Sequence, residues 1–266
     1  MQGDPGAHKA EARTRFNAAA AGYDAGPGVF AHFGRRLAAT VGIAAGNRVL
    51  DVASGHGAVL FPAIQQAGET GEVIGVDFAE EMVRAANEKA AGLGLGPCVR
   101  IMDAENLEFP DGSFDRVLCG FGIMFFPDQA RALAEFRRVL KPGGRLALST
   151  WKTHQAIEVE VALVSAGIVV PRLPGWITES ADLAQLLIAA GFGSVQVDAD
   201  TFSFRYQDAE EYWRQARGTG MRRTLDALDQ AKTEQVRATL MERMRPHQKD
   251  DGFYLGATAL LATAIR

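Results

Sequence analysis

One stretch of the chain decides its fold: residues 49–57, with the sequence VLDVASGHG. A short apolar run ends at Asp51, two glycines follow, and a second apolar run occupies residues 58–61. This order predicts a strand, a tight turn and a helix. Gly55 and Gly57 lack a Cβ, so the backbone of the turn can come close to a bound molecule. The acid at the strand end favours a cationic or hydroxyl-bearing ligand over a diphosphate.

Two phosphate-binding loops do not fit this stretch. A dinucleotide-binding loop has the pattern G-x-G-x-x-G, but the third glycine position holds Leu60. A P-loop has Lys and then Ser or Thr after its last glycine, and neither is present here. Taken alone, the stretch also fits an ordinary strand–helix turn that binds no ligand.

Two further predicted strands end in an acid, as the first one does. Asp77 ends the apolar run 74–77, at the place where an acid usually accepts hydrogen bonds from ribose hydroxyls. Asp77 also suits the N-cap of the helix that follows. Asp103 ends the run 99–103, where a carboxylate can bind the exocyclic amine of a base. Because the carboxyl ends of parallel strands meet at one edge of a sheet, the three acids are expected to face one crevice.

These motifs resemble those of the class I S-adenosylmethionine-dependent methyltransferases. The resemblance is greatest to the branch that contains the ubiquinone/menaquinone C-methyltransferases and many small-molecule tailoring enzymes. It spans roughly residues 45–151. The segments that carry it are 49–57, 75–78 with Met82, 103–107, 109–115 and 138–144. It implies S-adenosyl-L-methionine as the cofactor and S-adenosyl-L-homocysteine as the product.

The resemblance also implies which residues contact this cofactor. The first loop would hold the methionine end, Asp77 the ribose and Asp103 the adenine amine. The implied contacts are Tyr23, Asp51, Ala53, Ser54, Gly55, Gly57, Asp77, Phe78, Met82, Asp103, Ala104, Glu105, Gly120 and Phe121. His56 departs from the family, which often has Thr or another small residue there. Its side chain is expected to point along the turn or to alter the methionine end.

The expected fold class is α/β, in one domain of 266 residues. Alternating strands and helices predict a Rossmann-like, mostly parallel sheet with helices on both faces. The resemblance implies seven strands, with an antiparallel last strand at 252–265 beside the fifth. Two strand segments, 194–199 and 202–206, are predicted before it.

The chain is expected to divide into three parts. Residues 1–44 would form a polar, frayed tail up to about residue 14 and then a helical cap. Residues 45–151 would be the cofactor-binding core, and residues 152–266 would complete the same domain. Within the last part, residues 207–250 are rich in helix formers and are predicted to be a helical lid over the crevice. Packing of their Trp and Met residues onto the sheet is the alternative.

Composition excludes several classes of function. The formal net charge is −4 with no basic block, so no nucleic-acid partner is expected. Cys98 and Cys119 have no CxxC spacing, so no metal or redox site is predicted, and a cytoplasmic location is expected. No run of about 18 apolar residues predicts a membrane span, and the N-terminus does not resemble a signal peptide. A homo-oligomer formed through the cap or lid is left open.

Methyl transfer is an in-line displacement that needs alignment and, for a hydroxyl or carbon acid, a base. His154 follows the fifth strand and is the first candidate base, with a solvent-facing loop histidine as the alternative. His32 on the cap is the second, and His247 lies near the end of the lid.

Tyr23 matches a tyrosine that closes over the cofactor in this branch of the family, or else it only packs the cap. Phe121, Phe125 and Phe126 are expected to wall the adenine and acceptor pockets.

The sequence therefore predicts a methyltransferase that acts on oxygen or carbon of a small apolar or aromatic metabolite. A cofactor-binding member of the same fold with a cyclase or scaffold role is the alternative. An NAD-dependent oxidoreductase is disfavoured by Leu60 and Asp51.

Overall fold

The computed structural model describes residues 5–23, 26–154, 156–170, 175–217 and 221–266. These residues form one eight-stranded sheet in the order β3-β2-β1-β4-β5-β8-β6, with the short β7 paired to β8. The strands are β1 Arg48–Val52, β2 Glu72–Asp77, β3 Val99–Ile101, β4 Phe114–Gly120, β5 Leu140–Thr153, β6 Gly193–Tyr206, β7 Gln248–Lys249 and β8 Gly252–Ile265.

The strand directions confirm the predicted α/β architecture. Strands β1 to β5 are parallel, whereas β8 is antiparallel to both β5 and β6. The predicted segments 194–199 and 202–206 are in fact one continuous strand, β6. Because parallel strands share their carboxyl edge, the ends of β1, β2 and β4 lie next to one another there.

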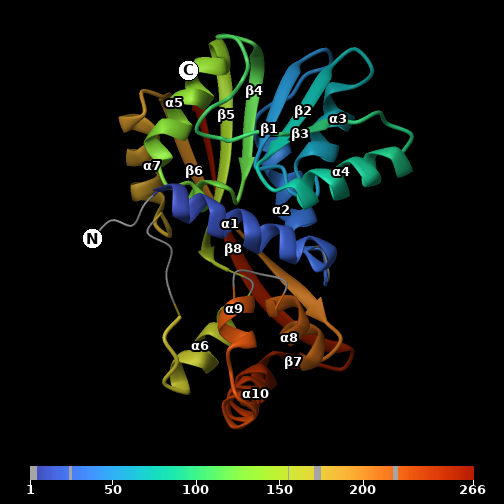
Figure 1. Ribbon diagram of the computed structural model, residues 1–266, viewed down its shortest axis with the longest axis vertical. Helices are drawn as coiled ribbons and strands as arrows, with labels where there is room; N and C mark the ends of the chain where they lie inside the picture. The colour runs from blue at the N-terminus through green and yellow to red at the C-terminus, as the bar shows by residue number, and fades with distance from the viewer. Residues whose placement is uncertain (1–4, 24–25, 155, 171–174, 218–220) are drawn as a thin grey trace.

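Helices cover both faces of the sheet (Figure 1). They are α1 Pro5–Ala19, α2 Val29–Thr40, α3 Leu60–Ala67, α4 Glu80–Gly92, α5 Gln129–Val139, α6 Ile157–Ser165, α7 Ser180–Ala189, α8 Ala209–Arg217, α9 Arg222–Asp226 and α10 Gln230–Met244, with single 3₁₀ turns at Ala20–Gly22, Ile123–Phe125 and Arg245–His247. Among these, no helix is both long and apolar enough to cross a membrane.

The two faces have separate hydrophobic cores because side chains alternate along each strand. Along β4, Leu118 belongs to the core under α2, α3 and α6, whereas Val117 and Cys119 belong to the core under α5 and α7. All three side chains have no exposed surface. Two-sided burial accounts for the nearly continuous apolar runs that mark these strands in the sequence.

The N-terminal segment differs from the prediction. A frayed tail was expected up to about residue 14, but helix α1 already begins at Pro5. Its sequence has no apolar stripe, so polar contacts with other elements add to the packing of its one aromatic side chain, Phe16. Asn17 donates to Glu80 Oε2 (2.8 Å) and accepts from the Glu81 N–H (3.0 Å), which ties α1 to the start of α4.

The last two long strands, β6 and β8, are connected through a helical lobe. β8 pairs with β5 only from Thr258 onward, whereas it pairs with β6 from Phe253 to Ile265. The unshared part of this ribbon carries α8, α9 and α10, and α6 packs against α10. Figure 1 shows these helices gathered at one end of the molecule, with α1 between them and the upper part of the sheet.

Candidate functional site

The loop between β1 and α3 is held by hydrogen bonds from the neighbouring strand. The Ser54 N–H donates to the Val76 carbonyl (3.0 Å), and the Gly55 N–H donates to Asp77 Oδ2 (2.9 Å). Ala53, Gly55 and Gly57 have φ values of 56°, 50° and 82°. This left-handed geometry is unusual for alanine, and such strain often marks a functional loop.

Gly55 and Gly57 have different structural roles in this loop. A Cβ on Gly57 would lie 2.4 Å from the ring of Phe61, so this glycine allows α3 to pack. A Cβ on Gly55 would meet only Tyr23, at 3.9 Å. Gly55 therefore leaves open space at the surface of a cavity, whereas Gly57 lines neither of the cavities described below.

Asp51, at the end of β1, is a buried carboxylate with unmet hydrogen-bonding capacity. Its exposed fraction is 1%, and within the described part of the chain neither carboxylate oxygen has a hydrogen-bond partner with good geometry, although the Leu60 N–H is close enough to lower its pKa in part. Burial raises the pKa of Asp51 well above its ordinary value, and the charge of Asp77 raises it further. An unpaired carboxylate in this setting suits a ligand that brings a cation or a hydrogen-bond donor.

Asp77, at the end of β2, accepts hydrogen bonds from two backbone N–H groups. Its Oδ1 accepts the Ala79 N–H (3.0 Å), in addition to the Gly55 N–H at Oδ2. Burial raises the pKa of Asp77, although these backbone donors lower it in part. A carboxylate can accept about four hydrogen bonds, so each oxygen keeps room for a ligand hydroxyl.

Replacing Asp51 with asparagine is expected to stabilise the fold at neutral pH. Since the folded-state pKa of Asp51 lies above its unfolded value of about 3.8, its contribution to stability is complete below 3.8 and is lost as the pH rises through the folded pKa. Asparagine cannot ionise, so Asp51→Asn should gain about 1 kcal/mol at pH 8, a common gain at functional sites. Urea denaturation of the variant and the wild type at pH 8 and pH 5 measures the difference in their unfolding free energies. A stability gain of Asp51→Asn that is larger at pH 5 than at pH 8 would contradict the prediction.

The third strand-end acid, Asp103, follows β3. Its Oδ1 accepts the Glu105 N–H (2.9 Å), and its Oδ2 lies 2.7 Å from the Nζ of Lys9 on α1. Lys9 Nζ is also 2.5 Å from Glu105 Oε2. The predicted tail residue Lys9 is thus part of the site.

An open cavity lies between the carboxyl edge of the sheet and α1; its empty space, part of which is open to solvent, is about 680 Å³. Its lining joins two of the strand-end acids to apolar and aromatic side chains. The lining residues are Lys9, Phe16, Tyr23, Val52, Ala53, Gly55, Asp77, Phe78, Met82, Met102, Asp103, Ala104, Glu105, Gly120, Phe121, Gly122, Phe125, Phe126 and Pro127.

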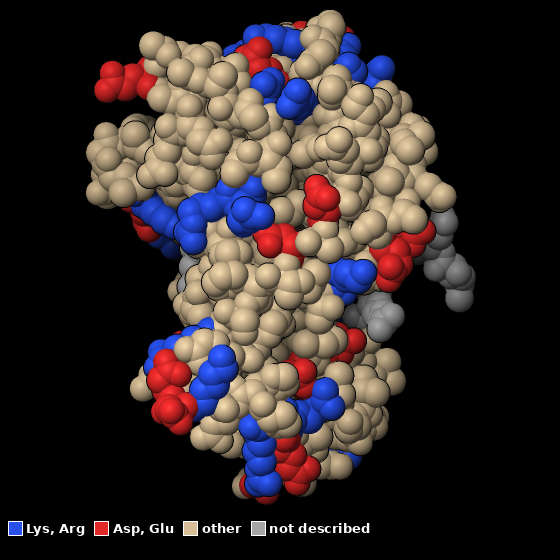
Figure 2. Space-filling view, turned by 180° about the vertical axis from the view of Figure 1, so that it is seen from behind, with Lys and Arg blue, Asp and Glu red and all other residues tan. Residues whose placement is uncertain are grey.

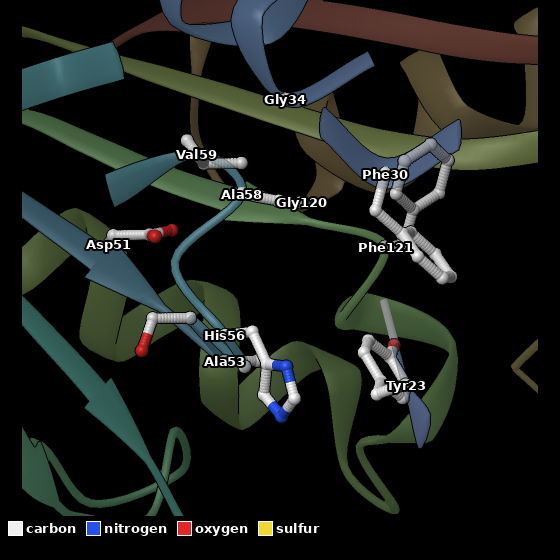
Figure 3. A pocket seen from close by; sticks show the side chains of 12 residues that line it. Tyr23, Phe30, Gly34, Asp51, Ala53, His56, Ala58, Val59, Gly120 and Phe121 are labelled. Atoms are coloured by element: carbon white, nitrogen blue, oxygen red, sulfur yellow. The ribbon is translucent and has the colours of Figure 1, made fainter. Parts of the chain in front are cut away.

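A second cavity, of about 400 Å³, adjoins the first (Figure 3). It is lined by Tyr23, Phe30, Gly34, Asp51, Ala53, Ser54, Gly55, His56, Ala58, Val59, Gly120 and Phe121. In Figure 3 Asp51 lies at one end of this cavity, and Tyr23, Phe30 and Phe121 lie at the other. Tyr23, Ala53, Gly55, Gly120 and Phe121 line both cavities, so the two spaces meet beside these residues.

Aromatic rings form the wall where the cavities meet. Phe121 stacks on Trp151 with ring centroids 3.9 Å apart, and Tyr23 stacks on Phe30 at 5.0 Å. Phe121 has a φ of 55°, and its N–H donates to the Ser149 side chain at 3.1 Å. These contacts fix a rigid apolar surface that can exclude water from a reacting centre.

Every residue predicted to contact the cofactor, except Gly57, lines at least one cavity. The two predicted bases do not. His154 lies 2.6 Å from Glu160 and packs against Trp176, and His32 stacks on Phe202 at 3.9 Å. Burial lowers the pKa of His32. Neither ring lines either cavity, so a role for either histidine as the base stays a prediction.

The sequence interpretation missed Lys9 and Phe16, because residues up to about 14 were assigned to a frayed tail and, within residues 1–44, only Tyr23 and His32 were given a role in the site. It noted His56 only as a departure from the family pattern. His56 lines the smaller cavity, and its ring lies 5.6 Å from that of Tyr23. Among the described residues no group of three or more His, Cys, Asp or Glu side chains is arranged to hold a metal ion.

The chain is similar in sequence to a methyltransferase family and to individual methyltransferases. Residues 50–148 match the family described as the methyltransferase domain. The chain is 44% identical to nocamycin O-methyltransferase of Saccharothrix syringae over 48% of this chain and 46% of that protein. It is 37% identical to aklanonic acid methyltransferase DauC of Streptomyces sp. strain C5 over 54% of this chain and 66% of that protein.

A third relative is the ubiquinone/menaquinone biosynthesis C-methyltransferase UbiE of Cupriavidus necator, which is 39% identical over 43% of this chain and 49% of that protein. The chain thus spans about half to two thirds of the length of these relatives. Among solved structures, the YcgJ protein of Bacillus subtilis has a TM-score of 0.60 at 21% identity and covers 88% of this chain and 98% of its own. That likeness shows the shared fold.

Proposed function

Given that the chain carries a domain of the class I S-adenosylmethionine-dependent methyltransferase family, we propose that it transfers a methyl group from S-adenosylmethionine to oxygen or carbon of a small apolar or aromatic metabolite. One observation carries the proposal: Asp51, Asp77 and Asp103 line adjoining cavities at the carboxyl edge of the parallel sheet. Carboxylates there suit a sulfonium with an ammonium tail and ribose hydroxyls, and they would repel a diphosphate.

The lining residues fit the parts of this cofactor in turn. Asp51, with no hydrogen-bond partner of good geometry among the described residues, would face the ammonium of the methionine end, beside the Ala53–Gly55 backbone. Asp77 would accept the ribose hydroxyls, and Asp103 the adenine amine. Phe78 and Met82 would pack on the base. When bound, the cofactor supplies an electrophilic methyl group on its sulfonium.

The chain itself contributes alignment and the exclusion of water. Positioning a nucleophile in line with the bond that breaks can lower the barrier by about 7–11 kcal/mol. Tyr23 and Phe121 stand where the two cavities meet, and Phe30, stacked on Tyr23, lines the smaller one; the three rings would hold an apolar acceptor against the methyl group. Where the acceptor must lose a proton, His56 lines the same space and would receive it.

The acceptor would enter beside the helical cap, with residues 207–250 acting as a lid. No described residue of that insertion lines either cavity. Its contribution would therefore come through α1, whose Ala18 carbonyl accepts from Arg222 and whose Glu11 pairs with Arg223. The compounds in the names of the relatives, nocamycin, aklanonic acid, ubiquinone and menaquinone, are all small molecules, which supports a small-molecule acceptor.

A nucleic-acid substrate is disfavoured. Basic and acidic side chains lie close together on the face in Figure 2, most of which is uncharged, and the whole chain has a net charge of −4. Binding to a phosphate backbone needs a continuous basic surface. We place the activity in the cytoplasm, where free thiols such as Cys98 and Cys119 persist.

The test begins with ligand binding and ends with transfer. Tryptophan fluorescence should respond to S-adenosylhomocysteine and not to NADH, since Leu60 replaces the third glycine of a dinucleotide loop. Labelled methyl groups should then appear on members of a panel of apolar hydroxylated or quinone-like metabolites. Binding of NADH alone would overturn the proposal. Tight binding of S-adenosylhomocysteine with no transfer to any acceptor would favour a non-methylating role such as a cyclase.

A further inference from the structure

Lys9 connects helix α1 to the far end of the larger cavity. Its Nζ reaches Asp103 at 2.7 Å and Glu105 at 2.5 Å, and the lysine itself lines the cavity. The two acids follow β3, whereas Lys9 is 94 positions earlier than Asp103 in the sequence. The ion pairs therefore attach the N-terminal helix to the carboxyl edge of the sheet.

Glu105 shows why a cation is needed here. Its side chain is 6% exposed, and its Oε1 accepts the Asp128 N–H at 2.9 Å. A buried carboxylate is costly unless it is paired. Burial lowers the pKa of Lys9, but the hydrogen bonds and charges of Asp103 and Glu105 outweigh this and raise it, so Lys9 remains a cation near neutral pH.

The same contacts hold Asp103 in one orientation. Oδ2 faces Lys9, and Oδ1 accepts the Glu105 N–H. Both oxygens keep lone pairs for a further donor. Without Lys9, the like charges of Asp103 and Glu105 would repel each other, and the half-exposed Asp103 side chain could turn away from the cavity.

We propose that Lys9 is a positioning residue for the base of the cofactor, because it holds the Asp103 carboxylate toward the exocyclic amine of adenine. This inference rests on the proposed function. Phe16, on the same helix, lines the same cavity and packs edge-on against Phe78 and Phe125. These ring contacts, together with the hydrogen bonds of Asn17 to α4, keep α1 at the adenosine end without Lys9.

The experiment compares two ligands in matched variants. The ligands are S-adenosylhomocysteine and its analogue with unsubstituted purine in place of adenine, which lacks the amine. The wild-type protein should prefer the adenine ligand about 10- to 100-fold, since a charged hydrogen bond is lost with the analogue. In Lys9→Met the Kd for S-adenosylhomocysteine should rise about tenfold, while the Kd for the analogue changes little.

Two further variants make the result specific. Lys9→Arg keeps a cation and should restore most of the preference for adenine. Arg13→Met removes one positive charge from the same helix, where Arg13 makes only an exposed pair with Glu80 at 3.5 Å. That variant should bind both ligands like the wild type. Circular dichroism confirms that each variant is folded.

Each outcome of this experiment either supports or overturns the proposal. A preference for adenine that collapses in Lys9→Met and returns in Lys9→Arg supports the proposal. An equal loss for both ligands in Lys9→Met overturns it, since Lys9 would then act only on the closure of α1. An effect of Arg13→Met as large as that of Lys9→Met also overturns it, because it would reflect the charge of the helix. Failure of the wild-type protein to bind S-adenosylhomocysteine would refute the proposed function instead.

Discussion

Asp77→Ala is expected to raise the Kd for S-adenosylhomocysteine about 100-fold. The carboxylate is 6% exposed and is proposed to accept both ribose hydroxyls. Hydrogen bonds to a charged group contribute about 1.5–3 kcal/mol each, and 2.7 kcal/mol corresponds to about 100-fold. The variant also removes the acceptor of the Gly55 N–H, so the loop that faces the methionine end loses an anchor.

The fold should tolerate this change. Burial raises the pKa of Asp77, and its charge raises that of Asp51, so the two carboxylates oppose each other in the native state. Removing one charge relieves that repulsion. Asp77→Asn is the matched control, because it keeps one oxygen acceptor and should lose less affinity than alanine. Isothermal titration with S-adenosylhomocysteine decides the matter, and an unchanged Kd in Asp77→Ala would show that the ribose lies elsewhere.

Gly34→Ala is expected to destabilise the protein by about 3 kcal/mol, at the upper end of ordinary overpacking effects. Gly34 lies in α2, and a Cβ there would stand 2.2 Å from the Ala58 carbonyl oxygen and 2.6 Å from its carbon. These are backbone atoms of the loop that leads into α3, so they cannot move aside as a flexible side chain would. Either α2 or the loop must shift.

Gly92→Ala provides the control for this prediction. Gly92 is also helical, in α4, but no atom lies within 4 Å of its added Cβ. That change should be neutral or stabilise by up to about 1 kcal/mol, because alanine is the better helix former. Urea denaturation of both variants gives the comparison. Equal stability of Gly34→Ala and the wild type would mean that α2 does not rest directly on the loop.

The core of the fold was predictable because its signals are local. Buried parallel strands are short apolar runs, and the acids that end them at Asp51, Asp77 and Asp103 can be read directly. The structure brings all three to adjoining cavities. Their common edge follows from the alternation of parallel strands and helices, which apolar periodicity and turn residues indicate.

The missing parts depend on contacts between distant segments. Helix α1 has no apolar stripe, and its part in the site is revealed by its ion pairs to the acids after β3, its hydrogen bonds to α4 and the ring contacts of Phe16. His154 follows a strand that points toward the crevice, yet Glu160, six residues later, draws the ring into the packing of α6. The apolar periodicity of the sequence predicts neither the ion pairs of Lys9 nor the pairing of His154 with Glu160.

The ribbon of β6 and β8 sets how the helical lobe is joined to the rest of the molecule. Tyr206 and Phe253 are direct partners in that ribbon, so the chain leaves for α8, α9 and α10 and returns from them through two adjacent residues. Topologically, everything between them is one enlarged hairpin loop. Doubling the length of such a loop costs only about 0.6 kcal/mol in closure entropy. Segments of very different size could therefore be grafted at this junction in evolution or in the laboratory without altering the register of the sheet.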